Sequence, residues 1–179
     1  MELILYQPEI PPNTGNIARL CAVTGVRLHL IEPLGFALED RYLKRAGLDY
    51  WPRVDLAVWP NLRAWHEAAT AARGGRPPRC VMTSARGGEA IHRFPFAADD
   101  CLVFGPETRG LPEEVLALSP WRTRIPMIAG RGRCLNLATS AGIALYAALA
   151  RCGLLDGPEW RPSGEATETA PETTMETGA

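Results

Sequence analysis

Short apolar segments alternate with helical segments along most of this chain, and this alternation constrains its fold more than any other feature. The apolar segments have the length of buried strands, which we predict at residues 2–7, 27–31, 54–58, 80–83, 101–104 and 124–127. Helical spacing or composition predicts helices at residues 14–23, 40–46, 62–72, 112–118 and 135–152. The alternation therefore predicts an α/β fold, with a mostly parallel sheet and helices on both of its faces.

The loops richest in glycine, proline and polar residues follow the ends of predicted strands. They come after the strands that we expect to end at Gln7, Thr83, Phe104 and Met127. Ligands of open parallel sheets bind at the carboxyl ends of the strands. The sequence thus predicts a ligand site at this edge. Neither G-x-G-x-x-G nor a P-loop is present, so a dinucleotide or nucleoside triphosphate is not indicated.

The first of these loops leads into the segment 13–19, which runs from asparagine to arginine. We expect residues 8–13 to be non-helical, because prolines disrupt helices. In the simplest interpretation Asn13 or Thr14 caps the helix and Arg19 is a solvated side chain. Alternatively, Arg19 and the helix N-terminus hold a phosphate. The residues alone leave both interpretations open.

Two further segments have a more restricted residue composition than an ordinary turn requires. Residues 104–112 place a glutamate, Glu107, between glycines and prolines. Gly105 would allow the backbone to approach a ligand closely, and Glu107 is either an exposed acid or an N-terminal contact. In the segment 133–142, Asn136 precedes the last helix and is most simply its N-cap. Small residues along that helix would let a neighbouring element or a second chain pack closely against it.

Charge is unevenly distributed along the chain. Residues 1–152 carry 18 basic and 14 acidic side chains, and all but one of the bases are arginine, which is compatible with a nucleic-acid partner. Residues 153–179 carry six acids and one base. From residue 157 on, this tail is rich in proline, glutamate, threonine and glycine, and we expect it to be disordered.

Cysteine spacing and hydropathy exclude several classes. None of the five cysteines belongs to a C-x-x-C pair, which argues against a disulfide framework or a zinc site and for free thiols in a reducing cytosol. No apolar run approaches the roughly 20 residues of a membrane span. The N-terminus has no signal-peptide pattern. We therefore expect a cytoplasmic protein without a membrane partner.

Taken in order, the segments 13–19, 104–112 and 124–142 resemble the three signature motifs of the SPOUT-class methyltransferases, specifically the TrmH-like ribose 2′-O-methyltransferases. Residues 7–16 and 45–50 resemble the small, single-domain TrmL-type members. The resemblance covers residues 1–153, which we take as one methyltransferase domain, and leaves out the acidic tail at 154–179.

The resemblance implies a C-terminal trefoil knot and a homodimer with its active site near the subunit interface. It implies that S-adenosylmethionine is held mainly by backbone groups of three loops, at the positions of Met82, Thr83, Gly105, Ile125, Cys134 and Leu135. The substrate-side, catalytic positions would be Asn13, Arg19, Glu107 and Asn136. The family usually has serine where this chain has Cys134, so only the backbone role carries over there.

The activity implied is methyl transfer to the ribose 2′-hydroxyl of the wobble nucleotide, C or U, of leucine tRNAs. The sulfonium donor is already activated, so no metal is expected, and DNA is not a substrate because it lacks the 2′-hydroxyl. Because a guanidinium is effectively always protonated, we expect Arg19 to clamp a phosphate and stabilise oxyanion charge rather than act as a base. The alternatives are another tRNA or rRNA position, or a non-catalytic RNA-binding protein of the same fold.

Overall fold

A computed structural model describes residues 1–38, 50–157 and 160. Its centre is one seven-stranded sheet in the order β3-β2-β1-β6-β4-β7-β5, in which every neighbouring pair is parallel. The strands are β1 (Glu2–Tyr6), β2 (Arg27–Ile31), β3 (Leu56–Trp59), β4 (Cys80–Thr83), β5 (Glu89–Ala90), β6 (Cys101–Phe104) and β7 (Arg122–Arg124).

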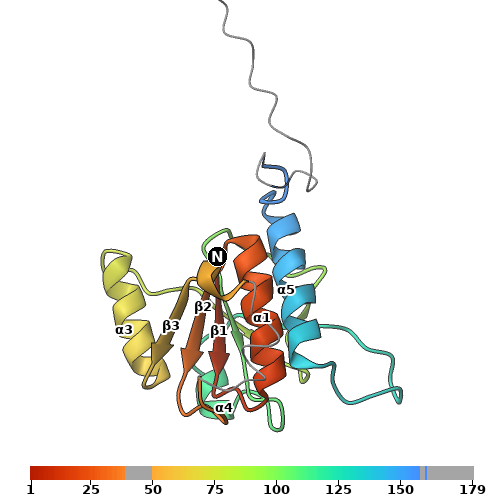
Figure 1. The fold of residues 1–179 in the computed structure, drawn as a ribbon. Helices are drawn as coiled ribbons and strands as arrows, with labels where there is room; N and C mark the ends of the chain where they lie inside the picture. Colours follow the sequence, from red (N-terminus) through yellow and green to blue (C-terminus); the bar gives the residue numbers. More distant parts are fainter. Residues whose placement is uncertain (39–49, 158–159, 161–179) are drawn as a thin grey trace, which may run out of the picture.

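Helices cover both faces of the sheet, as predicted (Figure 1). They are α1 (Pro11–Thr24), α3 (Leu62–Ala72), α4 (Glu113–Leu116) and α5 (Leu137–Arg151), with a 3₁₀ turn at Trp51–Arg53. One core cluster joins α1 and α5 to one face, and a second joins α3 and α4 to the other. The side chains of β1 alternate between the clusters, since Leu3 and Leu5 belong to the first and Ile4 to the second. No described helix is long and apolar enough to cross a membrane.

The first helix begins earlier than predicted. It starts at Pro11, after an N-cap residue, Ile10, whose side chain makes no capping hydrogen bond. Prolines are tolerated in the first helical turn, because the N–H that they lack would have no partner there. The expectation that residues 8–13 are all non-helical was therefore wrong. Neither Asn13 nor Thr14 is a cap, because both are buried inside the helix. The helix ends where predicted, at Gly25 in a left-handed conformation.

Other boundaries shift by a few residues. The last strand, β7, lies at Arg122–Arg124 and not at 124–127. An apolar run predicted the strand at 124–127, whereas β7 is polar. It buries Thr123, whose Oγ1 donates to the Glu89 carbonyl at 3.1 Å. That pairing also creates β5, which was not predicted. The predicted helix at 40–46 and most of the acidic tail lie outside the described residues, and the trefoil knot remains a prediction.

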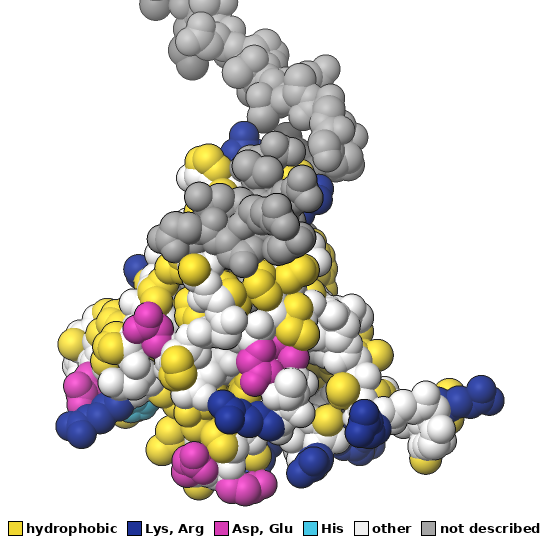
Figure 2. Space-filling view, turned by 60° about the horizontal axis from the view of Figure 1, so that its bottom comes forward, with side chains coloured by type: hydrophobic (Ala, Val, Ile, Leu, Met, Phe, Trp, Pro, Cys, Tyr) yellow, Lys and Arg dark blue, Asp and Glu magenta, His cyan; other side chains and the backbone are white. Residues whose placement is uncertain are grey.

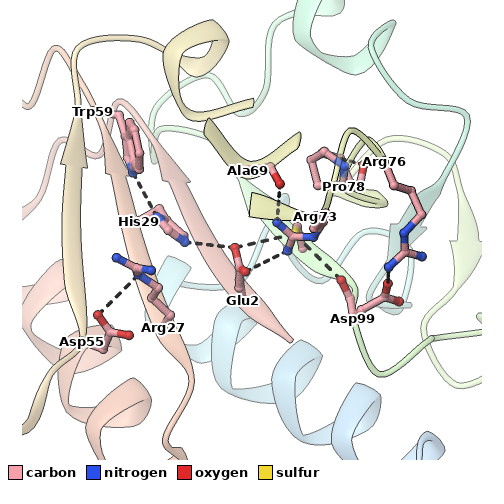
Figure 3. A network of polar contacts seen from close by, with 12 residues as sticks. Glu2, Arg27, His29, Asp55, Trp59, Ala69, Arg73, Arg76, Pro78 and Asp99 are labelled. Carbon is pink, nitrogen blue, oxygen red and sulfur yellow. Dashed lines mark hydrogen bonds and ion pairs between the residues drawn. The ribbon is translucent and has the colours of Figure 1, made fainter. Parts of the chain in front are cut away.

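A polar network ties three strands to the end of α3 (Figure 3). Trp59 Nε1 donates to His29 Nδ1 at 3.0 Å, so the proton of His29 sits on Nε2, which donates to Glu2 at 3.0 Å. Arg73 Nη2 donates to the other carboxylate oxygen of Glu2 at 2.8 Å. Glu2 therefore has two charge-assisted partners and links β1 to β2 and α3.

This network predicts an acid-sensitive contribution to stability. The hydrogen bond from His29 and the charge of Arg73 lower the pKa of Glu2 from 4.5 to about 2. Because the pKa in the folded state is depressed, the stabilisation is full above pH 4.5 and is lost as the pH falls toward about 2. For this half-buried carboxylate we expect about 2 kcal/mol at pH 7, roughly half of it lost by pH 3.5.

Urea unfolding of the wild type and of Glu2→Gln at pH 7 and pH 3.5 measures this contribution. The free-energy gap between the two proteins should narrow at the lower pH. Glu114→Gln, which removes an exposed acid of α4, should change stability by less than about 0.5 kcal/mol at either pH. A gap for Glu2→Gln that is the same at both pH values would contradict the assignment.

Candidate functional site

Three of the predicted cofactor positions lie together at one edge of the sheet. The strands β6, β4 and β7 are neighbours, so Gly105, Thr83 and Ile125 stand at or just after adjacent carboxyl ends. The ladder between these strands stops here, and the N–H groups of Gly105 and Ile125 have no backbone partner among the described residues. Unpaired backbone donors on adjacent strand ends fit a ligand held by main-chain groups.

The side chains at two of these positions face the protein. Met82 is buried in the cluster under α3 and α4, and Thr83 Oγ1 donates to the Val103 carbonyl at 2.8 Å. Only the main chain of β4 is therefore available to a ligand.

Gly105 is required by its own loop. A Cβ there would lie 2.2 Å from Leu111 N and 2.3 Å from the carbonyl carbon of Gly110. The loop folds back onto Gly105 through a turn in which Gly110 N donates to the Pro106 carbonyl at 2.8 Å. We expected this glycine to let a ligand approach the backbone. In the structure a side chain is excluded by the protein's own residues Gly110 and Leu111.

Cys134 and Leu135 are not brought to this edge. Every residue from 126 to 136 is exposed, and the segment extends away from the sheet and helices (Figure 1). The cofactor role of these two residues therefore remains a prediction.

Three of the four predicted catalytic residues form one hydrogen-bonded chain. Asn136 Nδ2 donates to Asn13 Oδ1 at 2.8 Å, and Asn13 Nδ2 donates to Glu107 Oε1 at 3.0 Å. The chain joins α1, the loop after β6 and the start of α5, and Asn13 is 94 residues from Glu107 and 123 residues from Asn136 in sequence. Asn13 stands at its centre and is 6% exposed, so its amide orientation is fixed from both sides.

Each end of this chain also completes a helix terminus. Asn136 is the N-cap of α5, as predicted, and its Oδ1 accepts from Ala138 N at 2.8 Å and Thr139 N at 3.3 Å. Glu107 accepts from the backbone N–H groups of Glu9 and Ile10, just before α1, at 2.8 and 3.2 Å. A carboxylate at this end of a helix also interacts favourably with its dipole. The geometry thus makes Glu107 a contact to the N-terminal segment and not a free acid.

Arg19 is on the same helix as Asn13 but is separate from the chain. It is exposed, and its guanidinium carbon lies 4.6 Å from the centroid of the Tyr50 ring. Its Nη2 also donates to the Tyr50 hydroxyl at 3.4 Å. We did not single out Tyr50 as a site residue, although the segment 45–50 belongs to the resemblance. Stacking on an aromatic ring orients a guanidinium without consuming all of its donors.

The face at the carboxyl ends of the strands carries both basic and acidic side chains (Figure 2). Exposed arginines occur on α1 and in the loops after β4, β6 and β7: Arg19, Arg86, Arg109, Arg131 and Arg133. Each of these guanidinium groups could pair with a phosphate of a nucleic acid.

All five cysteines are free, as predicted. Burial raises the pKa of Cys21 to about 12 and that of Cys80 to about 11, so these thiols stay protonated and unreactive. Among the described residues there is no group of three histidine, cysteine or acidic side chains that could hold a metal ion.

Known proteins are similar to this chain in fold and in sequence. A solved structure determined to study the 2-OH methylation of C/U34 on tRNA is 51% identical, with a TM-score of 0.76, covering 84% of this chain and 94% of that one. A tRNA (cytidine(34)-2′-O)-methyltransferase of Aeromonas hydrophila is 49% identical over 148 residues, which are 82% of this chain and 90% of the relative. The enzyme so named in Methylovorus glucosotrophus is 52% identical over 149 residues, which are 82% of this chain and 92% of the relative.

The parallel sheet and these similarities define the class of this protein, which is a methyltransferase of the SPOUT type. More particularly, the chain belongs to the SpoU rRNA methylase family, which matches residues 1–146.

Proposed function

We propose that this chain transfers a methyl group from S-adenosylmethionine to the ribose 2′-hydroxyl of the wobble nucleotide, C or U, of leucine tRNAs. The observation that carries the proposal is the chain Asn136–Asn13–Glu107, together with an exposed arginine, Arg19, on the helix that carries Asn13. The names of the similar enzymes support the same nucleotide position and the same hydroxyl.

In this proposal the main-chain groups at Met82, Thr83, Gly105 and Ile125 would hold the methyl donor, and the backbone of Cys134 and Leu135 would supply further contacts. The donor supplies a methyl group already activated by a sulfonium, so no metal is needed. The chain Asn136–Asn13–Glu107 fixes polar groups beside the target ribose. Arg19 clamps the neighbouring phosphate and stabilises the negative charge that develops on the 2′-oxygen. Alignment of this kind supplies roughly 7–11 kcal/mol of rate acceleration in favourable cases.

We further propose that the enzyme acts as a homodimer in the cytoplasm. Exposed apolar residues on α1 and α5, namely Val23, Ile143 and Tyr146, support a second copy packing on this side. The family resemblance supports the trefoil knot. DNA is not a substrate, because the acceptor is the 2′-hydroxyl.

The test is methyl transfer by the purified protein. Unmodified leucine tRNA and S-adenosylmethionine are incubated with it, and the digested RNA is analysed by mass spectrometry. A 2′-O-methylated C or U at the wobble position is the expected product, and a matched tRNA with a 2′-deoxyribose at that position should accept no methyl group.

Two other outcomes favour the alternatives. Methylation of a different position in total cellular RNA would assign the enzyme another tRNA or rRNA target. If calorimetry detects S-adenosylmethionine binding and no RNA is methylated, the chain is a non-catalytic RNA-binding protein.

A further inference from the structure

We infer that Glu9 is a positioning residue of this site, an inference that rests on the proposed function. Glu9 lies in the segment 7–16 of the family resemblance, but it was not among the expected catalytic residues. Glu9 lies in the turn between β1 and α1 and is half-buried. Its carboxylate holds the loop that carries Glu107, while Glu107 holds the backbone of Glu9 in return.

The two glutamates form a reciprocal clamp. Glu9 N donates to Glu107 Oε2 at 2.8 Å. In the opposite direction, Thr108 N donates to Glu9 Oε2 at 3.0 Å and Thr108 Oγ1 donates to Glu9 Oε1 at 2.9 Å. Both carboxylate oxygens of Glu9 thus accept hydrogen bonds from Thr108, which is adjacent to Glu107 in the chain. The loop after β6 cannot move relative to the turn before α1 without breaking several of these bonds.

A second pair supports the clamp on the side of β1. Arg109 Nη2 donates to Gln7 Oε1 at 2.8 Å. Gln7 has a φ of 50°, the only positive φ of a non-glycine residue in the described part of the chain. Such a conformation costs free energy and persists only where surrounding contacts impose it. Gln7 N donates to the Ile31 carbonyl at 2.9 Å, which fixes this residue to β2.

The loop after β2 supports the turn from a third side. Gly35 N donates to the Pro8 carbonyl at 2.9 Å. A Cβ at Gly35 would lie 2.8 Å from Glu9 Cα and 2.9 Å from Glu9 O, so the two backbones are in direct contact. The loop after β2 therefore fixes the backbone of the turn at Pro8 and Glu9. The Glu9 carboxylate in turn fixes Thr108 and, next to it, Glu107.

This arrangement assigns separate roles to the two acids. Glu107 orients Asn13, and through it Asn136. In the described structure Glu9 has no hydrogen bond to either asparagine, and it acts by fixing the loop of Glu107. Loss of the Glu9 carboxylate should leave the fold intact but let the loop after β6 move, which misaligns the substrate-side groups.

The experiment compares Glu9→Ala and Glu9→Gln with Glu32→Ala. Glutamine keeps one acceptor oxygen for Thr108 N, and its amide can donate to the hydroxyl of Thr108. Glu32 is an exposed acid after β2, so its replacement by alanine removes the same charge near the same edge of the sheet. Steady-state kcat and KM are measured on the RNA that the wild type methylates, well below the melting temperature of each variant.

We expect Glu9→Ala to lower kcat about tenfold with a smaller change in KM, because the chemistry is misaligned more than RNA binding is weakened. Glu9→Gln should recover to within about threefold of the wild type, and Glu32→Ala should stay within about twofold. A Glu9→Ala enzyme with the wild-type kcat, or a Glu9→Gln enzyme as impaired as Glu9→Ala, would overturn the inference.

Amide hydrogen exchange tests the clamp independently of methyltransferase activity. The Thr108 N–H should exchange about tenfold faster in Glu9→Ala than in the wild type, and at the wild-type rate in Glu32→Ala. Unchanged exchange at Thr108 overturns the inference even if the wild type methylates RNA. Faster exchange combined with an inactive wild type would support the clamp and count against the proposed function alone.

Discussion

Replacing Asn13 by alanine is expected to lower kcat/KM for RNA methylation about 100-fold, because displacing catalytic groups by about 1 Å can cost that much. Asn13 is the only link between Glu107 and Asn136 in the described structure. Without it, Glu107 Oε1 keeps only Ile10 N as a donor, and Asn136 Nδ2 loses its acceptor. We also expect a stability loss of about 1–3 kcal/mol from these two lost hydrogen bonds.

Two further variants separate the site from the fold. Asn13→Asp keeps the size of the side chain but turns an oxygen toward Glu107 in place of the amide donor, so it should not restore activity. Asn61→Ala removes a different asparagine, the N-cap of α3, whose Oδ1 accepts from Ala64 N at 2.9 Å. It should cost about 1 kcal/mol of stability and leave kcat/KM unchanged. Equal effects of Asn13→Ala and Asn61→Ala on activity would mean that the network serves only stability.

Replacing Arg19 by alanine should reduce kcat/KM by roughly 100- to 1,000-fold, the loss typical when a charged stabiliser of a developing oxyanion is removed. Arg19 is exposed, and its partner Tyr50 is a ring on the same surface, so stability should change by less than about 0.5 kcal/mol. Arg19→Lys keeps the charge without the planar fork and should be intermediate. Activity loss without stability loss is the signature of a residue that acts on the substrate.

The salt dependence of RNA binding provides a second test of the role of Arg19. If it contacts one phosphate, the slope of log affinity for RNA against log salt should fall by about one in Arg19→Ala. Arg63→Ala, which removes an exposed arginine of α3 paired with Glu67 at 2.7 Å, should leave the slope and kcat/KM within about twofold of the wild type. A wild-type rate for Arg19→Ala would rule out both the phosphate clamp and the oxyanion role.

The order of strands and helices was predictable because burial imposes a period on the sequence. The strands β2, β4 and β6 and the helix α3 have the predicted bounds, since each carries a dense apolar pattern. The prediction failed where the pattern was polar, as in β7, or where a general rule about proline had an exception, as at Pro11 and Pro12. Polar strands are recognised only through the partners that bury them.

The candidate site could also be predicted only in part. Motif resemblance named Asn13, Glu107 and Asn136, and the structure places them in one hydrogen-bonded chain. It could not find Glu9 or Tyr50 as partners of these groups, because each acts through a residue far away in sequence: Thr108 for Glu9 and Arg19 for Tyr50. Nor could it show that Gly105 is packed against its own loop.

Local patterns in the sequence were enough to predict the α/β class, the edge of the sheet at which we propose the site, and the residue types available there. These follow from local spacing, since hydrophobic period and turn chemistry act over a few neighbouring residues. The polar groups that meet, such as Asn136 and Asn13 across 123 residues of chain, are known only from the folded structure. Hydrogen bonds over such separations depend on how the strands are ordered in the sheet, and that order is set by packing of the whole chain.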